Sequence, residues 1–323
     1  MSDYQFPYKD ASFLINHILG FDQACADAGL EEVNSELADA ILEEAARLGS
    51  EVFAPLNEIG DREGARLEED GVHETPGYAE AYKQYAEMGW AALCAGEEYG
   101  GQAMPRVLGA ATTEIWYSAC TSLSLCPLLT TGAVEAIEKH GTDELKSAYL
   151  PDLISGNWTA SMCLTESAAG SDLAAVACKA VQEDDHYLVS GQKIYITWGD
   201  HQMTENISHL VLARLPDAPA GVWGISLFLV PKFLLDENGR PGKRNDVYCV
   251  GIEHKLGIHG SPTCTMSFGD NGGAVGYMVG QPNQGLMAMF TMMNEARQGV
   301  GIQGLGVAER SYQQAAPYAK ERL

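Results

Sequence analysis

Two stretches near the middle of the chain combine small, hydroxylated and aromatic residues in a pattern that suits an organic ligand. The first, Cys163–Asp172, is a run of small and hydroxylated residues after a predicted strand, where backbone N–H groups can approach a ligand closely. The second, Gly191–Gly199, places Tyr195 and Thr197 two positions apart, hence on one face of a strand. An aromatic plane beside a hydroxyl suits a flat heteroaromatic ring with an edge nitrogen. Taken singly, each stretch also fits an ordinary turn or a structural side-chain pair.

Several other residues could carry acid, base or metal chemistry, but their surroundings favour structural roles. His254 and His259 lie in a Gly-rich segment without Cys or carboxylate at metal-ligand spacing, so no metal site is predicted. Glu97 and Glu98 precede Tyr-Gly-Gly at a predicted helix-loop corner and are interpreted as residues that shape this turn. The eight cysteines include no C-x-x-C pair and are interpreted as reduced thiols.

Composition narrows the class of partner. The chain has 323 residues, 20 Lys and Arg against 44 Asp and Glu, and a net charge of −24, so its average surface potential repels nucleic acid. A phosphorylated cofactor can still bind at a local anion site. The sequence begins without a basic and apolar leader, and no integral membrane segment is predicted, so a cytoplasmic location is expected.

The elements that must position these residues follow from periodicity. Residues 1–157 show helical periodicity and predict an all-helical N-terminal domain, whereas residues 158–278 alternate with period two and predict an antiparallel β-barrel or sandwich. Helical periodicity returns over residues 279–323, which predict the first, incomplete part of a C-terminal helical domain. The expected fold class is therefore α+β and multidomain, with the chain ending inside a domain.

Five stretches, taken in order, resemble the acyl-CoA dehydrogenase family. They are EMGWAALCAGEEYGGQAMP, SMCLTESAAGSD, GQKIYITWGD, EHKLGIHGSPTCTMSF and NEARQGVGIQGLGVAERSYQQAAPYAKER, and together they reach across most of the chain. The opening YKDASFLINHILGFDQ is most similar to the longer subgroup typified by 3-methylmercaptopropionyl-CoA dehydrogenase.

The resemblance implies an FAD enzyme that removes two hydrogens from the α and β carbons of an acyl-CoA and passes electrons to an electron-transferring flavoprotein. A base takes the α proton while the flavin accepts the β hydride. Because the α proton of a thioester is a weak acid, hydrogen-bond donors must hold the carbonyl oxygen where enolate charge develops. The cofactor performs the hydride step, and the protein orients it.

The resemblance also assigns roles to individual residues. Thr197 is expected to donate to flavin N5, Tyr195 to lie against the ring, and Ser171 to contact both the cofactor and the CoA part of the substrate. The remaining residues expected at the cofactor are Met162, Leu164, Thr165 and Ile196, with Arg322 reaching the FAD pyrophosphate of a neighbouring subunit. Asn294 and Arg297 are expected near the CoA thioester.

The sequence departs from the family pattern at several of these positions. Tyr195 stands where the family often has Trp, and Trp198 stands where it often has Asn. The usual loop E-P-G-A-G-S-D is here E-S-A-A-G-S-D, with Ser167 and Ala168 in place of proline and glycine. These replacements bear on the backbone geometry of the loop.

The catalytic base is expected beyond Leu323. In one branch of the family the base stands immediately before the arginine of the NEAR motif, where this sequence has Ala296. Glu295 is the alternative candidate, but one step along a helix turns a side chain by about 100° and moves it about 1.5 Å. The other branch supplies its base from a later helix, which Ala296 fits.

Other functions remain open from the sequence. An acyl-CoA oxidase or a flavin monooxygenase could use the same scaffold, and a non-catalytic acyl-CoA-binding scaffold could retain the fold. Thr165, Ser171, Thr197 and Arg297 favour an enzyme, because a scaffold does not need hydroxyls at the flavin-facing positions. A homodimer or homotetramer is expected, because the apolar C-terminal helix must be covered.

Overall fold

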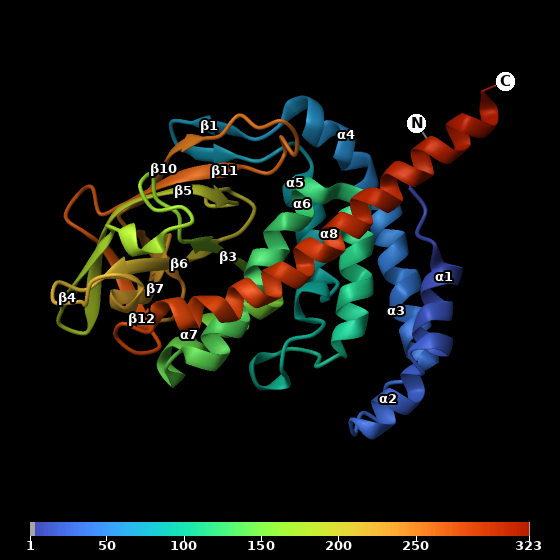
Figure 1. Ribbon diagram of the computed structural model, residues 1–323, viewed down its shortest axis with the longest axis horizontal. Coiled ribbons are helices and arrows are strands. Elements are labelled where there is room, and N and C mark those ends of the chain that lie inside the picture. The colour runs from blue at the N-terminus through green and yellow to red at the C-terminus, as the bar shows by residue number, and fades with distance from the viewer. Residues whose placement is uncertain (1–3, 323) are drawn as a thin grey trace.

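The computed structural model describes residues 4–322 as a layer of helices beside a β domain, with one long helix running along both (Figure 1). The helices are α1 (Tyr8–Phe13), α2 (Phe21–Asp27), α3 (Ser35–Leu48), α4 (Ala54–Glu63), α5 (Tyr78–Glu87), α6 (Arg106–His140), α7 (Asp143–Ser155) and α8 (Gly285–Glu321). Shorter helical turns occur at Leu14–Ile18, Gly49–Phe53, Trp90–Ala92, Glu97–Tyr99, Leu173–Ala175 and Val222–Gly224. Helices, then strands, then a helix confirm the predicted fold class.

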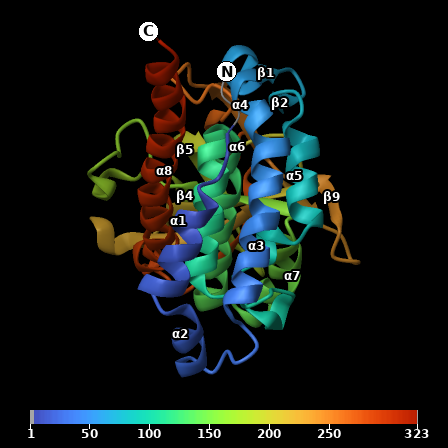
Figure 2. The same cartoon turned by 90° about the vertical axis from the view of Figure 1, so that its right-hand side faces the viewer.

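Helix α6 forms the centre of the helical layer, and α3, α4, α7 and α8 pack against it (Figure 2). Its backbone leaves the helical region at Cys120 (φ −152°, ψ 89°), so that two helical segments meet at a kink there. By length and hydropathy alone α6 could cross a membrane, but its most apolar window is 72% buried inside the protein. The apolar side chains of α6 therefore serve the core of the helical layer.

The prediction that residues 1–157 are entirely helical is wrong at one place. Strands β1 (Arg66–Glu68) and β2 (Gly71–His73) form an antiparallel hairpin between α4 and α5. Three-residue strands are too short to show a period, and the Asp-Gly dipeptide at the turn is the only sequence signal for the hairpin. Val72 is fully buried in the core of the β domain, so the hairpin ties the helical layer to that domain.

The β domain is one eight-stranded sheet with a small hairpin beside it. The strands are β3 (Trp158–Cys163), β4 (Lys179–Glu183), β5 (His186–Thr197), β6 (Asn206–Arg214), β7 (Ile225–Pro231), β8 (Phe233–Leu235), β9 (Pro241–Arg244), β10 (Val247–Ile252), β11 (Thr263–Phe268) and β12 (Ala274–Val279). The order is β10-β11-β5-β12-β7-β6-β3, with β4 paired to β5 and β6. The pairs are antiparallel except those that β6 makes with β3 and β4.

Strands β6 and β7 are buried on both faces, which explains their nearly continuous apolar sequence. Leu210 and Leu212 face α7 and α8, whereas Val211 and Ala213, on the opposite face, join the core inside the β domain. Each fully buried Leu contributes about 1.5–3 kcal/mol relative to an exposed one. This two-sided burial fixes the position of β3, which pairs with β6 and leads into the Ser/Gly loop.

Trp198 joins the end of β5 to the helical layer. Its backbone is left-handed (φ 51°), and its indole is 1% exposed. The indole Nε1 donates to the carbonyl oxygen of Ser122, just past the kink of α6, at 3.0 Å, and the ring lies 6.2 Å from that of Tyr78. Trp198, which stands where the family that the sequence resembles often has Asn, therefore anchors the end of β5 to the helical layer.

Helix α8 approaches α6 closely through glycines. A Cβ at Gly299 would lie 2.3 Å from Leu128 Cδ1, so no larger residue fits at this crossing without a shift. On another side of α8, Val300, Leu305 and Tyr312 are each more than half exposed. The C-terminal end of the helix extends away from the sheet (Figure 1).

Candidate active site

Strand β3 presents alternate side chains at the mouth of the Ser/Gly loop. Ser161 and Cys163 are buried, while Met162 and Leu164 are partly exposed on the other face. Ser161 is fixed from inside, because its hydroxyl lies 2.8 Å from His209 Nδ1. The alternation places Met162 and Leu164 on the accessible side, as the resemblance requires.

The loop after β3 is closed by its own backbone. The N–H of Glu166 donates to the carbonyl of Ala169, and the N–H of Ala169 donates to the carbonyl of Glu166, both at 3.0 Å. Ser167 and Ala168, the two departures from the family loop, lie exposed in this tight turn. They are compatible with a closed turn, because their side chains point into solvent. Ser171 follows in an exposed position.

A β-bulge shapes the end of β5. Cys264 of β11 pairs with Ile196 and Met266 pairs with Lys193, so one extra residue lies in β5 between these two pairs. Tyr195 takes up the irregularity with a left-handed backbone (φ 60°) and is 58% exposed. Ile196 is buried, and Thr197 is partly exposed. The sequence predicted the neighbourhood of Tyr195 and Thr197 but not the bulge.

The two segments meet at this edge of the β domain. The N–H of Ile194 donates to the carbonyl of Thr165 at 2.9 Å, which fixes the start of the loop beside the bulge. Among the described residues, no protein group is hydrogen-bonded to the hydroxyls of Thr165, Ser171 and Thr197. An exposed phenol ring beside unpaired hydroxyls is a donor set that fits the flat, polar-edged ring of a flavin.

The NEAR motif of α8 divides between two faces of the helix. Arg297 Nη1 donates to Asn294 Oδ1 at 2.7 Å, and the guanidinium lies 5.3 Å from the ring centroid of Phe290 on the exposed side. Glu295 points instead toward α6, where its Oε2 accepts from Arg106 Nη1 at 2.8 Å. Glu295 therefore faces away from the side occupied by Asn294 and Arg297.

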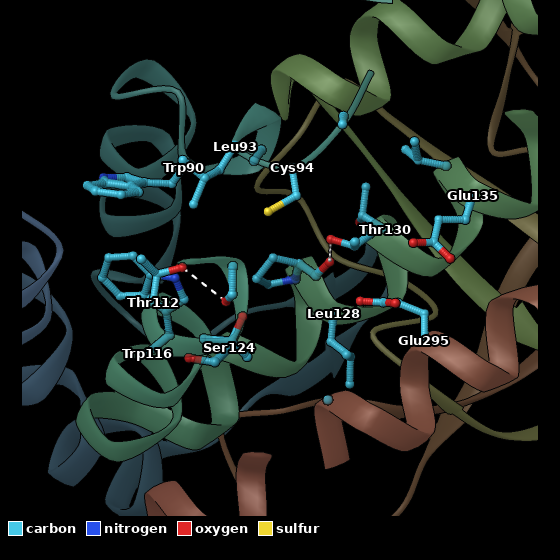
Figure 3. A pocket seen from close by; sticks show the side chains of 18 of the residues that line it. Trp90, Leu93, Cys94, Thr112, Trp116, Ser124, Leu128, Thr130, Glu135 and Glu295 are labelled. Carbon is cyan, nitrogen blue, oxygen red and sulfur yellow. Dashed lines mark hydrogen bonds between the residues drawn. The ribbon is translucent and has the colours of Figure 1, made fainter. Parts of the chain in front are cut away.

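Glu295 lies at the wall of a cavity of about 140 Å³ between α5, α6, α7 and α8 (Figure 3). The aromatic part of the wall comprises Tyr82, Tyr85, Trp90 and Trp116. Arg106, Glu135 and Glu295 form an ionic cluster at the wall, in which the guanidinium bridges the carboxylates of α6 and α8. Thr130, another wall residue, accepts from the N–H of Ala160 on β3 at 3.1 Å, which links the cavity wall to the loop strand.

The ionic cluster perturbs its carboxylates. Burial raises the pKa of Glu295, as does the neighbouring Glu135, and Arg106 opposes both effects. Burial also raises the pKa of Glu138 at the same cavity wall. A carboxyl with a raised pKa is a candidate acid or base, but the direct partner of Glu295 is a structural cation.

Three residue groups lie apart from this edge. Arg322 is exposed at the end of α8, where its guanidinium contacts Tyr318 (Nη1 to the phenol oxygen, 3.3 Å). Both ring nitrogens of His259 face backbone carbonyls, those of Asp61 and Lys255, each at 3.0 Å, so neither nitrogen is available to a metal. This is the structural role that the sequence predicted for His259. Glu97 and Glu98 lie exposed in the short helical turn Glu97–Tyr99.

Sequence reasoning missed two features of the site. The ionic cluster joins positions 189 residues apart, Arg106 and Glu295, and nothing in the local pattern of either marks the other. Glu166 and Lys193 form a buried ion pair beneath the loop, although the family resemblance assigns no role to either residue. The sequence contained one sign of this ion pair, because Glu166 and Lys193 are charged residues in segments that are otherwise rich in apolar or small residues.

Comparison with known proteins defines the class. The acyl-CoA dehydrogenase N-terminal domain matches residues 35–157, and the acyl-CoA dehydrogenase middle domain matches residues 161–271. The chain belongs to the acyl-CoA dehydrogenase family.

Three individual proteins show how similar this chain is to known members of the family. The chain is 50% identical over 321 residues to 3-methylmercaptopropionyl-CoA dehydrogenase of Ruegeria pomeroyi, covering 99% of this chain and 54% of that protein. It is 35% identical over 332 residues to a butyryl-CoA dehydrogenase of Syntrophomonas wolfei, again covering 99% and 54%. The structure of Caenorhabditis elegans ACDH-11 in complex with C11-CoA shares the fold (TM-score 0.80, 22% identity), covering 100% of this chain and 55% of that one. The chain spans about half the length of the curated relatives it matches.

Proposed function

We propose that this chain provides the flavin-binding face of an FAD-dependent acyl-CoA dehydrogenase. The observation that carries the proposal is the edge of the β domain, where the hydroxyls of Thr165, Ser171 and Thr197 have no partner among the described residues and lie in segments joined by the Ile194–Thr165 hydrogen bond. The exposed ring of Tyr195 completes the face. The bound FAD would supply the hydride acceptor.

The side chains at this edge would bind the flavin and orient it. Thr197 would donate a hydrogen bond at flavin N5, and Tyr195 would cover the ring. Thr165, with Met162 and Leu164 on the accessible face of β3, would contact the pyrimidine edge. Ile196 is buried beneath this surface and would support it rather than contact the ring.

The substrate would be an acyl-CoA with a short or medium acyl group, such as 3-methylmercaptopropionyl-CoA, the substrate in the name of the 50% identical relative. Ser171 would contact the CoA part, and Asn294 and Arg297 would lie near the thioester. The base would be a residue other than Glu295, which the ionic cluster holds toward α6. Electrons would pass to an electron-transferring flavoprotein.

The protein would act as a homodimer or homotetramer. Arg322 supports this arrangement, because it is exposed at the end of a helix that extends away from the sheet, and a guanidinium fork suits the pyrophosphate of a neighbouring subunit's FAD. Sedimentation of the FAD-loaded protein tests the assembly. A strictly monomeric loaded enzyme would count against it.

An anaerobic titration tests the function. Purified protein that is yellow and loses its 450 nm absorbance (roughly the usual flavin band) on addition of an acyl-CoA would support a flavin enzyme that oxidises thioesters. Reoxidation by an electron-transferring flavoprotein, but only slowly by air, separates a dehydrogenase from an oxidase or monooxygenase. Colourless protein that cannot be reconstituted with FAD would support a scaffold. A panel of acyl-CoA chain lengths identifies the substrate.

A further inference from the structure

A buried ion pair lies directly beneath the candidate flavin-binding face. Lys193 Nζ is 2.7 Å from Glu166 Oε1, and the two side chains are 0% and 8% exposed. Glu166 belongs to the loop after β3, and Lys193 belongs to β5 at the edge of the bulge. Neither residue has a role in the flavin chemistry described above.

Each member of the pair also holds backbone. Lys193 Nζ donates to the carbonyl of Leu164 at 2.9 Å. Glu166 Oε2 accepts from the N–H of Ala177 at 2.8 Å, and Oε1 accepts from the N–H of Cys178 at 3.1 Å. The carboxylate therefore closes the segment from Glu166 to Cys178 on itself, while the ammonium ties the start of that segment to β5.

These bonds lie close in sequence to Thr165 and Tyr195, two of the residues proposed to face the flavin. Thr165 immediately precedes Glu166, and Tyr195 follows Lys193 by two residues. The hydrogen bond from Ile194 N–H to Thr165 carbonyl runs between them. A change in the pair would thus move the loop and the bulge relative to each other.

The charges are well compensated although they are buried. Burial acts to raise the pKa of Glu166, but Lys193 and the N–H of Ala177 outweigh it, so that this pKa lies below its usual range. Two buried charges are costly to desolvate, and an apolar pair of similar volume often stabilises a fold as well or better. The pair is therefore better explained by the geometry it imposes than by the stability it adds.

We propose that Glu166 and Lys193 are positioning residues that fix the loop after β3 against the bulge of β5 in the arrangement that receives the flavin. This inference rests on the proposed function, because it assumes that the flavin binds at this face.

A second buried ion pair in the same domain offers a matched control. Lys232 Nζ lies 2.7 Å from Asp200 Oδ1 and donates to the carbonyl of His201 at 2.8 Å, much as Lys193 does at Leu164. Asp200 accepts from the N–H of Val72 in the β1–β2 hairpin at 3.3 Å, not from the loop after β3. Loss of the Lys232–Asp200 ion pair should therefore destabilise the protein without releasing the loop after β3.

The test compares Glu166→Gln, Lys193→Met, the double variant with both changes, and the control Lys232→Met. Glu166→Gln keeps the shape of the side chain but turns an NH₂ group toward the N–H of Ala177, where two donors repel. The double variant removes both charges together, which avoids leaving one buried charge without a partner. For each protein, thermal unfolding and amide hydrogen exchange over residues 164–178 are measured without FAD, and the FAD Kd is measured by flavin fluorescence.

We expect the double variant to unfold near the wild-type temperature, yet to exchange faster over residues 164–178 and to bind FAD at least about 10-fold more weakly. Lys232→Met should lower the unfolding temperature and leave exchange over residues 164–178 unchanged. If the double variant regains wild-type exchange and FAD affinity along with its stability, the pair is merely structural and the proposal is overturned. Wild-type protein that fails to bind FAD would instead overturn the proposed function, and this role with it.

Discussion

Tyr195 and Thr197 owe their accessibility to one extra residue in β5. Without the bulge, the alternation that buries Lys193 would continue and would also bury Tyr195. The left-handed backbone at Tyr195 is uncommon for an aromatic residue, and such strain gathers at functional sites. At the scale of single residues, the site is thus a backbone irregularity that exposes a ring and a hydroxyl together.

Replacing Thr197 by Val tests its hydroxyl without opening a cavity. One hydrogen bond to the reacting flavin corresponds to about 1–3 kcal/mol of transition-state stabilisation, so flavin reduction at saturating acyl-CoA should slow by roughly 5- to 150-fold. The fold should tolerate the change, because the side chain is partly exposed. Stopped-flow reduction measures the rate. Thr197→Ser restores the hydroxyl as a control and should recover most of the rate, whereas a Val variant as fast as wild type would refute the role.

Glu295→Gln tests the position of the base. Because Glu295 is bound to Arg106 on the α6 side of the helix, we expect turnover within about threefold of wild type in protein whose flavin is reduced by acyl-CoA. Glu135→Gln removes the other carboxylate that contacts Arg106 and provides a matched control for damage to the cluster. A loss of about 10²-fold or more that is specific to Glu295→Gln would identify Glu295 as the base.

The sequence singled out the segments around Thr165 and Thr197 because each is a short contiguous motif, and the structure joins these two segments through the Ile194–Thr165 hydrogen bond. The sequence did not predict the ion pairs around them, since Glu166 and Lys193 beneath the loop are 27 positions apart, and Arg106 and Glu295 at the cavity are 189 positions apart. Pairings of this kind depend on tertiary packing, which no local period encodes. The ion pairs that support the site are therefore seen only in the structure and not in the sequence.

At the scale of elements, the kink of α6 and the end of β5 form one joint. The helix interruption at Cys120 lies two residues before Ser122, whose carbonyl accepts a hydrogen bond from the indole of Trp198. Tyr78 contacts both this indole and the thiol of Cys120. Helical periodicity over residues 1–157 predicted a helical layer but not the kink of α6. Two-residue alternation likewise predicted the strands but not the three-residue hairpin at residues 66–73, which shows no period at all.

Trp198→Phe tests this joint. Phenylalanine keeps much of the ring packing but leaves the buried carbonyl of Ser122 without its donor, so the free energy of unfolding should fall by about 1–3 kcal/mol. Urea unfolding followed by circular dichroism measures the change. Trp223→Phe is the control, because that indole is 79% exposed and its loss should be nearly neutral. Equal stability of the two variants would show that the joint does not stabilise the fold.

At the scale of the whole molecule, the helical layer and the β domain are also joined through His259. His259 in the β10–β11 connection bonds the carbonyl of Asp61 at the end of α4 through Nδ1 and the carbonyl of Lys255 through Nε2. Carbonyl oxygens only accept, so both bonds form together only when the imidazole carries two protons. The carboxylate of Asp61, 3.3 Å from Nδ1, favours the same state.

This contact predicts a pH-dependent stability. The hydrogen bonds to Asp61 and Lys255 raise the pKa of His259 above its ordinary value of 6.5. A histidine with a raised folded-state pKa stabilises the protein fully below the unfolded-state pKa, and this contribution disappears as the pH rises through the folded-state pKa. The stability of wild type relative to His259→Gln should therefore be greatest at pH 5.5–6 (roughly the range below the unfolded pKa) and should shrink toward pH 8–9, about where histidine is neutral.

His254→Gln separates this contact from general titration of the loop. The ring of His254 is exposed and stacks on that of His259 at 6.0 Å, so its replacement removes an imidazole from the same loop but leaves both carbonyl contacts in place. Urea unfolding of the three proteins at several pH values should show a stability difference for His259→Gln that shrinks as the pH rises, and His254→Gln controls for the loss of an imidazole from this loop. A difference for His259→Gln that stays constant or grows with pH would mean that the imidazole is neutral in the folded protein. One of the two carbonyls would then lack its imidazole donor, and the end of α4 would be joined to the β10–β11 connection by the N–H of Ala65, which donates to the carbonyl of His259 at 3.0 Å.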